Sequence, residues 1–483
     1  MIFLGTRATV KEGFRYIRLA DELENNIMAG VYRAGEKLPS IRRLHRRTGF
    51  SITTVYQAFI ELEKRGLVAP RQKSGYFVRP RRGRILKTPD WQRYRAVPKK
   101  VTVGTLASSI VEAMSDPSFL QLGGTLTAPV LLPVKALSRS LRSLTARQLT
   151  TGLATYENPY GNPGLREQIA KRTLPAGPVN GIDDLVITNG CIEAVGLCLQ
   201  AVARPGDTIV VESPTYPWFL QLIEDLNMLA LEVPTDPQNG IDLEALARAV
   251  RENTVAACIL VPNFHNPLGC VMPEAHKKRL VTMLEAGGIP IIEDDIHGEL
   301  FFEGTRPTSL KAYDRQGMVL YCSSFSKTLA PGLRLGWTIP GRYRDRVRRL
   351  KLNLSIASPT LNQLVMAAYL KDGAFERHLR RLRPALMTQA ANLALAVARY
   401  FPEGTKMTSP KGGVTLWIEL ANKIDALQVF HQAREQRIAI MPGIMCSTTR
   451  RYRHCIRLSC GFPWSDALEA GVKTIGDIIH NLN

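Results

Sequence analysis

The residue with the clearest potential for chemistry is a lysine in a serine-rich turn. Lys327 lies four residues after the apolar run at 319–323, and the residues between them are rich in serine. Two serines and an arginine accompany it along the chain: Ser324, Ser326 and Arg334. A lysine amine held at a strand end can form a Schiff base with an aldehyde. The alternative is a lysine that is simply solvated in a loop.

Three further groups supply what one cofactor, pyridoxal 5′-phosphate (PLP), requires of a protein. Its pyridinium nitrogen needs a carboxylate, and Asp294 ends a buried apolar run. Its phosphate suits the N–H groups at a helix start, here the strand-to-helix junction at Gly190, Cys191 and Ile192. Its ring needs an aromatic neighbour, for which Tyr216 is the candidate. Asp294 could instead cap the next turn, and Tyr216 could be an ordinary core residue.

The motifs around these residues resemble those of the fold-type I aminotransferases. The resemblance covers the segments 156–161, 188–194, 212–216, 263–269, 323–327 and 331–337. It implies that Lys327 is the Schiff-base residue and that Ser324, Ser326 and Arg334 bind the phosphate. It also implies that Asp294, and not the adjacent aspartate, faces the pyridine nitrogen. We therefore expect a PLP site at the carboxyl ends of the strands.

The same resemblance gives roles to three residues outside that group. Asn266 would bond the ring hydroxyl, and Tyr156 would reach the phosphate of a neighbouring subunit. Arg457, in the strand at 455–458, would grip the α-carboxylate of an amino acid as a bidentate pair. One departure concerns the residues after Asp294, where relatives often carry a tyrosine. Here Ile296 and His297 follow, and His297 could supply a pH-dependent substitute or be a loop histidine.

The N-terminal fifth of the chain is strongly basic. Residues 1–100 contain 23 Lys and Arg against 8 Asp and Glu, whereas the remaining residues contain 40 against 34. The formal net charge of +21 is therefore concentrated in an N-terminal head, which indicates a polyanionic partner. A basic surface that merely keeps the protein in solution is the alternative.

The pattern of the head predicts three helices and a basic hairpin. Apolar spacing places helices near 14–28, 38–45 and 51–64. Short strands at 67–69 and 75–78 follow. This is the order of a winged helix-turn-helix, whose second motif helix enters the DNA major groove. The residues on the first turns of that helix are Thr53, Thr54 and Tyr56.

The head, taken as residues 11–79, resembles the GntR family of winged-helix regulators. The resemblance is carried by segments such as Leu38–Ser40, Thr53–Val55 and Ser74–Val78. It implies DNA contacts by Arg42 and by three wing residues, Lys73, Ser74 and Gly75. Ile52 stands where the family often has arginine, which leaves the base preference open. A winged helix that docks onto a protein is the alternative.

After the head we expect a basic, flexible linker at 80–104 and an α/β body at 105–483. Apolar runs of strand length at 185–188, 208–212, 256–261, 289–293 and 319–323 alternate with helical stretches. This alternation predicts a mainly parallel sheet covered on both faces. The body should divide into a large subdomain at about 135–345 and a smaller α+β subdomain at about 346–483.

The eight cysteines are scattered, with no CxxC pair and no metal-ligand spacing. They suit a reducing compartment and predict neither disulfides nor a metal site. No apolar stretch has the length of a membrane span, and the N-terminus does not look like a signal peptide. We therefore expect a soluble cytoplasmic protein with no membrane partner.

Together the two halves resemble the MocR subfamily of bacterial regulators, which joins a GntR-type head to an aminotransferase-like body. The resemblance implies a homodimer, a DNA operator and a small-molecule effector. Three functions stay open: a regulator that senses an amino acid, an amine or PLP at Lys327, a working aminotransferase with a DNA-binding head, and a regulator with an inert body. The joint presence of Lys327, Asp294 and Arg334 argues against the inert body. The operator, target genes, effector and sign of regulation are not predicted.

Overall fold

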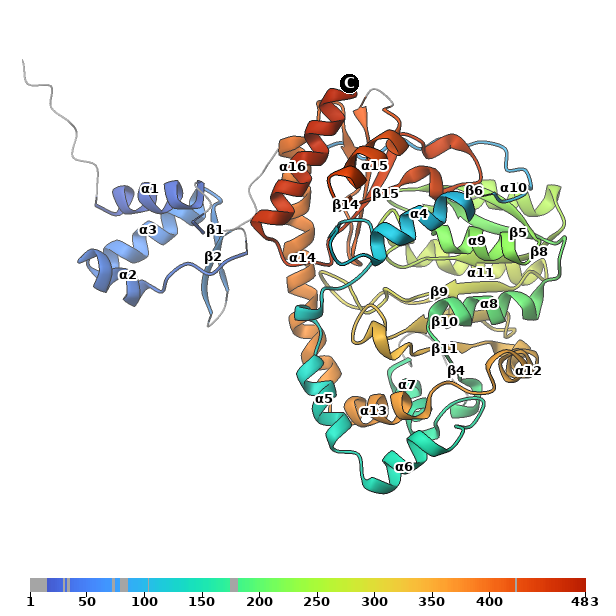
Figure 1. The fold of residues 1–483 in the computed structure, drawn as a ribbon. Coiled ribbons are helices and arrows are strands. Elements are labelled where there is room, and N and C mark those ends of the chain that lie inside the picture. The colour runs from blue at the N-terminus through green and yellow to red at the C-terminus, as the bar shows by residue number, and fades with distance from the viewer. Residues whose placement is uncertain are drawn as a thin grey trace, which may run out of the picture. The chain divides into compact units, whose positions relative to one another are not determined.

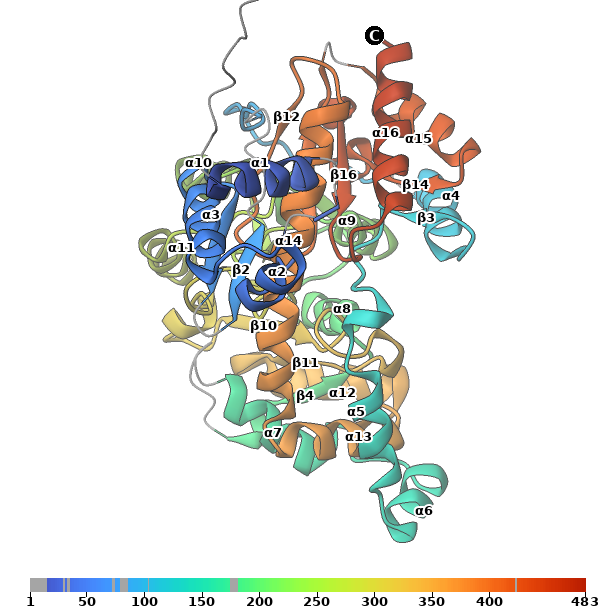
Figure 2. The ribbon, with the colours of Figure 1, turned by 90° about the vertical axis from the view of Figure 1, so that its left-hand side faces the viewer.

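The computed structural model describes residues 15–28, 31–32, 35–71, 74–78, 86–102, 104–173, 181–421 and 424–483. The chain forms two compact units, Met1–Arg84 and Ile85–Asn483. Figures 1 and 2 show the N-terminal unit in blue and the C-terminal unit from cyan to red. Each unit has its own hydrophobic core. No helix among the described residues has the length and apolar content needed to cross a membrane.

Three helices and an antiparallel hairpin make up the N-terminal unit. They are α1 (Arg15–Met28), α2 (Ile41–Thr48), α3 (Ile52–Lys64), β1 (Val68–Arg71) and β2 (Gly75–Val78). The Ser40 and Ser51 hydroxyls accept the N–H groups of Arg43 and Thr54, so they cap α2 and α3. Gly49, with a φ of 71°, ends α2 and turns the chain into α3. Residues from all five elements meet in the core: Leu19, Leu23, Leu44, Val55, Phe59, Leu62, Val68 and Val78.

The C-terminal unit is built on an eight-stranded sheet in the order β4-β11-β10-β9-β8-β5-β6-β7. Its strands are β4 (Val186–Thr188), β5 (Thr208–Ser213), β6 (Leu229–Asp236), β7 (Gly240–Ile241), β8 (Val255–Leu260), β9 (Ile291–Asp294), β10 (Val319–Ser324) and β11 (Gly336–Ile339). The run from β10 to β6 is parallel, whereas β11 and β7 run antiparallel to their neighbours. Parallel strands end at one edge of a sheet, which is where ligands bind in such folds.

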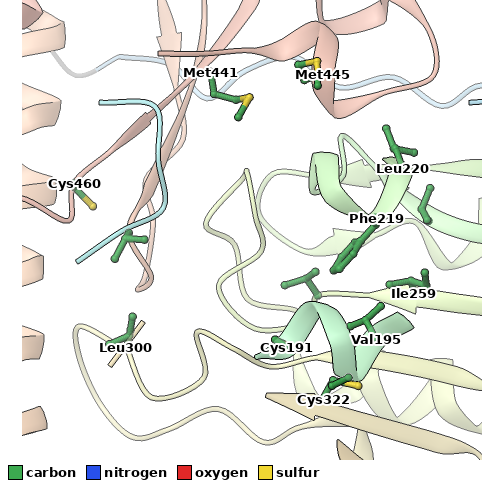
Figure 3. Packing of buried hydrophobic residues seen from close by; sticks show 14 of the residues in the cluster. Cys191, Val195, Phe219, Leu220, Ile259, Leu300, Cys322, Met441, Met445 and Cys460 are labelled. Atoms are coloured by element: carbon green, nitrogen blue, oxygen red, sulfur yellow. The ribbon is translucent and has the colours of Figure 1, made fainter. Parts of the chain in front are cut away.

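Helices cover both faces of this sheet. Val211 of β5 packs into the core on the α8 side (α8, Cys191–Val202), while the adjacent Val210 packs on the opposite side. That opposite side is covered by α10 (Leu243–Glu252) and α11 (Glu274–Ala286). Figure 3 shows the α8 side, where Cys191 and Val195 lie with Phe219 and Ile259. Burial on both faces explains why the strands are continuous apolar runs. The other helices here are α5 (Val134–Arg142), α6 (Ala146–Ala154), α7 (Pro163–Thr173), α9 (Pro217–Asp225), α12 (Arg344–Ser355) and α13 (Thr360–Lys371).

A smaller subdomain holds a four-stranded sheet in the order β12-β13-β16-β15. The strands are β12 (Lys406–Met407), β13 (Thr415–Glu419), β15 (Met441–Pro442) and β16 (Cys455–Ser459), and each pairs antiparallel with its neighbour. A parallel pair, β3 (Leu120–Gln121) with β14 (Ile438–Ala439), adds an earlier part of the chain. The helices are α4 (Gly104–Ser115), α14 (Ala374–Tyr400), α15 (Ala426–Glu435) and α16 (Asp466–Asn481).

The predicted α/β class and the mainly parallel central sheet are confirmed. The five predicted strands correspond to β4, β5, β8, β9 and β10. Two strands lack a clear sequence signal: β6 contains Glu232 and Pro234, and β11 is only four residues long.

The expected boundaries inside the C-terminal unit differ from the structure. Residues 86–102, placed in a flexible linker, lie on the body through contacts such as the paired Lys99 and Ala230. Residues 120–121 join the smaller subdomain by pairing with β14, and α13 packs on α5, α6 and α7 of the larger one. Sequence periodicity misses this arrangement because it does not report pairing between distant segments.

Candidate functional site

A cavity of about 170 Å³ lies at the carboxyl ends of the parallel strands. Its walls come from the turns after β4, β5, β8, β9 and β10 and from a loop near residue 125. Eight of the predicted site residues line it: Cys191, Ile192, Tyr216, Asn266, Asp294, Ser326, Lys327 and Arg334. The topology therefore brings together residues that are separated by up to about 140 positions in the sequence.

Lys327 points its amine at the loop that closes the cavity. Its Nζ donates to the Thr125 carbonyl at 2.7 Å and lies 3.1 Å from the Thr125 hydroxyl. Burial, and next the positive charge of Arg457, lower the pKa of Lys327 to about 8. At neutral pH roughly one amine in ten is then uncharged, which is the form that reacts with a carbonyl carbon.

Asp294 is buried at the end of β9. Its Oδ1 accepts the Ile296 N–H at 2.9 Å and lies 3.4 Å from the Cys191 thiol, which donates to it. Burial raises the pKa of Asp294 to about 6, although both hydrogen bonds favour the carboxylate. A carboxylate in this position can pair with a protonated ring nitrogen.

The start of α8 forms a cradle with an arginine. Gly190 precedes the helix with a φ of 93°, and a Cβ at this position would lie 2.3 Å from the Arg334 guanidinium. A residue with a side chain would be strained at this φ, and the guanidinium would have to move. Arg334 donates to the Asn189 carbonyl at 2.9 Å, and the Ser324 hydroxyl accepts the Ser326 N–H at 3.2 Å. Helix N–H groups, a guanidinium and hydroxyls suit a phosphate dianion.

Arg457 and Asn266 bond to each other. Arg457 Nη1 donates to Asn266 Oδ1 at 3.0 Å, and its Nη2 donates to the Gly123 carbonyl at 2.6 Å. The Arg457 side chain is buried, and its Nε has no hydrogen-bond partner among the described residues. Burial lowers the pKa of Arg457. Arg457 does not line the cavity but lies directly behind Asn266.

Tyr216 and His297 complete the walls. Tyr216 stacks on Trp218 with ring centroids 5.6 Å apart, and burial raises its pKa to about 12. His297 is 1% exposed, and neither ring nitrogen forms a hydrogen bond of good geometry with a described residue, although the Phe264 backbone is near. Burial, and next the charge of Lys327, lower the pKa of His297 to about 3. This histidine is therefore neutral, and it keeps hydrogen-bonding capacity for a ligand.

Tyr156 lies outside the cavity of its own chain, and three residues that were not predicted line that cavity. Tyr156 is 83% exposed on the loop after α6 and does not line the cavity of its own chain. Cavity-lining residues that were not predicted are Thr125, Trp218 and Val261. Trp218 could have been suspected from its place two residues after Tyr216. Thr125 and Val261 carry no chemical signal in the sequence.

The predicted DNA-contacting residues of the head lie mostly on its surface. Arg42, Thr53, Tyr56, Ser74 and Gly75 are exposed, whereas Lys73 lies outside the described residues. Thr54 is half-buried, and its hydroxyl lies 2.8 Å from that of Ser51. Ile52 is also exposed.

The four arginines of α2 have a different environment from Arg65, which follows α3. Arg42, Arg43, Arg46 and Arg47 form no ion pair with another described residue and are exposed. Arg65, after α3, instead bonds Asp21, Glu24 and Glu61 and so ties α3 to α1. Four exposed arginines within eight residues make α2 the densest concentration of unpaired positive charge in the described head, where a phosphate backbone could meet it.

Residues 15–78 match the family of bacterial regulatory proteins named gntR, and residues 127–469 match the class I and II aminotransferases. The chain is 39% identical over 467 residues to YjiR, an uncharacterized HTH-type transcriptional regulator of Escherichia coli (strain K12), with 96% of this chain and 99% of that protein covered. The chain belongs to the GntR-type regulators that carry an aminotransferase class I and II domain. The predicted MocR-like architecture is confirmed. NorG, an HTH-type transcriptional regulator of Staphylococcus aureus (strain USA300), is 27% identical to this regulator over 91% of this chain and 98% of its own.

Solved structures of aminotransferases are similar to the body of this regulator. The kynurenine aminotransferase of Pyrococcus horikoshii gives a TM-score of 0.72 at 27% identity, over 78% of this chain and 94% of its own. LysN is an α-aminoadipate aminotransferase of Thermus thermophilus, solved in complex with N-(5′-phosphopyridoxyl)-L-leucine. It gives a TM-score of 0.73 at 27% identity, over 78% of this chain and 96% of its own. The cofactor of this regulator is therefore pyridoxal 5′-phosphate, and its helix-turn-helix domain binds DNA.

The cavity residues fit that cofactor. The start of α8 offers helix N–H groups beside the Arg334 guanidinium, which approaches Gly190 closely, and this donor set suits a phosphate. The buried His297 nitrogens offer unused polar atoms inside the same cavity. Among the described residues, no cluster of His, Cys, Asp and Glu could hold a metal ion.

Proposed function

We propose that this regulator controls transcription in response to an amino acid, an amine or PLP itself, which it senses at Lys327. The observation that carries the proposal is the convergence of Lys327, Asp294 and Arg334 on one cavity in a chain with a DNA-binding head. An inert body would have no need for a buried, partly uncharged lysine beside a carboxylate and a phosphate cradle, because buried charges destabilise the fold.

Each cavity residue has a proposed role toward PLP. When bound, PLP supplies an aldehyde that bonds amines and a ring that withdraws electrons. Lys327 would offer the amine, and Asp294 would keep the ring nitrogen protonated. The N–H groups at Gly190, Cys191 and Ile192 would hold the phosphate together with Ser324, Ser326 and Arg334. Tyr216 would pack on the ring.

The effector would be held by a second set of residues. Arg457 is the only buried arginine that contacts a cavity-lining residue in the described part of the site. A carboxylate could replace Asn266 Oδ1 as the acceptor of Arg457 and leave the Asn266 amide to bond the cofactor ring. His297, being neutral, would act as a hydrogen-bond partner near Lys327 and not as a charge.

We propose that the protein acts as a homodimer whose contact surface lies on the α6 side of the body. Several exposed large apolar residues of the body lie in or next to α5, α6 and the end of α12: Val130, Val134, Leu153, Tyr156, Leu354 and Ile356. Such a surface is costly to leave in water and typical of an interface. Tyr156 would then lie at the partner's site.

A working aminotransferase is the second candidate function. The resemblance of the body to solved aminotransferases supports it, as does the presence of both Lys327 and Arg457. The sensor and the enzyme differ in what happens to the cofactor after an amino acid has bound. A sensor holds the amino acid on PLP, whereas an enzyme converts PLP to pyridoxamine phosphate.

The test is a visible absorption spectrum of the PLP-loaded protein during titration with single amino acids and no keto-acid acceptor. A shifted absorption band that persists, together with a changed affinity for a selected DNA fragment, would support the sensor. Loss of visible absorption and formation of pyridoxamine phosphate would support the enzyme. A spectrum that no amino acid or amine changes would contradict the enzyme and the sensing of amino acids and amines, and would leave PLP itself as the sensed ligand.

A further inference from the structure

The segment that joins the head to the body is attached to both subdomains of the body. We call residues 86–102 the strap. The strap has no helix or strand of its own, yet it makes specific contacts along its length. Its first residues follow the boundary between the two units at 84 and 85. A change in the contacts of the strap would therefore occur close to the residues that connect the body to the head.

The first part of the strap lies on the smaller subdomain. The Met407 N–H of β12 donates to the Lys87 carbonyl at 2.8 Å. The Asp90 N–H donates to a Glu419 carboxylate oxygen of β13 at 3.0 Å, and Lys406 pairs with both acids. Backbone and side-chain bonds thus fix residues 87–90 to the edge of the four-stranded sheet.

The second part of the strap lies on the larger subdomain. Lys99 exchanges two backbone hydrogen bonds of 2.9 Å with Ala230 of β6. Arg93 pairs with Asp242 at the start of α10, and Val101 is buried in the core. The strap therefore crosses from one subdomain to the other between residues 90 and 93.

Tyr94 follows this crossing and enters a junction of three parts of the chain. The Arg451 guanidinium of the smaller subdomain covers its ring, 3.5 Å from the centroid. Its hydroxyl is buried beside Ser213 and Glu232 but forms no hydrogen bond of good geometry with a described group. Burial, and next the charge of Glu232, raise the pKa of Tyr94 above its ordinary value. The ring thus fills the junction through packing.

Glu232 of β6 ties the junction together. It accepts hydrogen bonds from the hydroxyls of Ser213 and Ser447, each at 2.7 Å, and from the Thr448 N–H. Ser213 ends β5 in the larger subdomain, whereas Ser447 and Thr448 belong to the smaller one. One buried carboxylate therefore links both subdomains underneath Tyr94.

The junction continues directly into the cofactor cavity. Ser213 is three residues before Tyr216, which lines the cavity. Between them, the Thr215 N–H donates to the Cys446 carbonyl at 2.9 Å, next to Ser447. A movement of the smaller subdomain relative to the larger one would thus act on the 213–216 segment and on Tyr94 together.

We propose that Tyr94 is a positioning residue for the 213–216 segment, through which the strap couples the cofactor cavity to the head. The coupling to DNA rests on the proposed function, whereas the positioning of Tyr216 does not. The physical basis is that packed junctions move between discrete arrangements and do not deform continuously. A ligand that favours one arrangement of Tyr216 and the smaller subdomain favours one position of the strap.

The experiment uses the full-length protein loaded with PLP and compares three variants at the junction with one control. Tyr94→Ala removes the ring, Tyr94→Phe removes only the hydroxyl, and Glu232→Gln weakens the link if Tyr94→Ala does not fold. Arg95→Ala is the matched control, because the neighbouring Arg95 side chain is 80% exposed and pairs only with Glu252 at the surface. Tyr216→Ala is the reference variant, because it shows how much the spectrum changes when the aromatic ring in the cavity is removed directly.

The first readout is the visible circular dichroism of bound PLP, which reports the asymmetry of its surroundings. We expect Tyr94→Ala and Glu232→Gln to change it in the direction of Tyr216→Ala, and Tyr94→Phe and Arg95→Ala to match the wild type. Loss of stability alone would lower the melting temperature and leave this signal unchanged. An unchanged spectrum in Tyr94→Ala and Glu232→Gln would overturn the positioning role.

The second readout is the affinity for a DNA fragment selected on the wild-type protein, measured with and without PLP. Typical coupling between two sites would make PLP change the DNA affinity of the wild type about fivefold or more. In Tyr94→Ala the ratio of DNA affinities with and without PLP should then fall to near one. PLP and DNA should each still bind to this variant separately. A preserved ratio in Tyr94→Ala would overturn the coupling. If PLP does not change the affinity of the wild type for DNA, the proposal that the protein senses PLP is wrong. The circular dichroism result still decides whether Tyr94 positions the 213–216 segment.

Discussion

The head and the body of this protein handle positive charge in opposite ways. In the head, the four arginines of α2 are exposed and unpaired among the described residues. In the body, Arg457 is buried and Lys327 is half-buried, and each donates to protein oxygens. Exposed charges act at long range and are screened by salt, whereas buried charges act at contact distance and have shifted pKa values. The head is therefore suited to find a polyanion, and the body to recognise a small molecule by its chemistry.

The comparison is tested most strongly by removing the body's lysine. Lys327→Ala should abolish the visible absorption of lysine-bonded PLP, because no other lysine lines the cavity. Affinity for DNA in the absence of PLP should stay within about twofold, since the change lies outside the head. Lys171→Ala, at an exposed lysine paired with Glu167, is the control. The same visible band in Lys327→Ala would show that the site is assigned wrongly.

The converse experiment unfolds the head and leaves the body folded. Phe59 is 1% exposed in the head core and stacks on Tyr76 at 4.7 Å. Phe59→Ala should cost about 3–5 kcal/mol, which is most or all of the stability of so small a unit. DNA binding should be lost while PLP binding and its spectrum persist. Phe59→Leu should lose less. Simultaneous loss of PLP binding would contradict the independence of the two units.

The same comparison explains how much could be predicted from the sequence. In the head, Ser40, Gly49 and Ser51 set the helix ends through bonds to neighbours in the chain, so local signals suffice. In the body, Asp294 and Lys327 stand at the ends of apolar runs, and parallel strands gather their ends at one edge. These residues could be placed without a structure.

Other features of the body depend on contacts between distant residues. Thr125 meets Lys327 across 202 positions, and Asn266 meets Arg457 across 191. The strap has a basic, proline-containing sequence typical of a linker, and its order comes from partners such as Glu419 and Ala230. No periodicity within the strap reports those partners. The proposed role of Tyr156 depends on a second chain, which a single sequence does not place.

Covalent capture of PLP should depend on pH because of two buried groups. The pKa of Lys327 is lowered to about 8 and that of Asp294 is raised to about 6, both mainly by burial. When the ammonium form of Lys327 bonds the aldehyde as a neutral carbon–nitrogen double bond, water and one proton leave, so the apparent dissociation constant should fall about tenfold per pH unit from 6 to 8 and then level off. Below pH 6 the dependence should steepen, because Asp294 takes up a proton and no longer pairs with the ring nitrogen.

Absorbance titrations with PLP between pH 5 and 9 measure this dependence. Asp294→Asn should bind PLP more weakly and remove the extra steepness below pH 6, while the change from 6 to 8 remains. DNA affinity without PLP should lack the step near pH 8. A dissociation constant that is flat from 6 to 8 would mean that the Lys327 amine is not the titrating group.

The smallest expected effect concerns a single exposed arginine of the head. Arg42 is one of four unpaired arginines on α2, so its loss leaves most of the local positive charge in place. Arg42→Ala should weaken DNA binding severalfold and reduce the slope of log affinity against log salt by about one. Arg18→Ala, at an exposed arginine on α1, should change neither quantity as much. Because phosphate contacts carry no sequence information, Arg42→Ala should weaken selected and unrelated DNA equally. A loss confined to the selected fragment would instead place Arg42 on a base edge, and equal effects of Arg18→Ala would show that the head attracts DNA through its overall charge and not through α2.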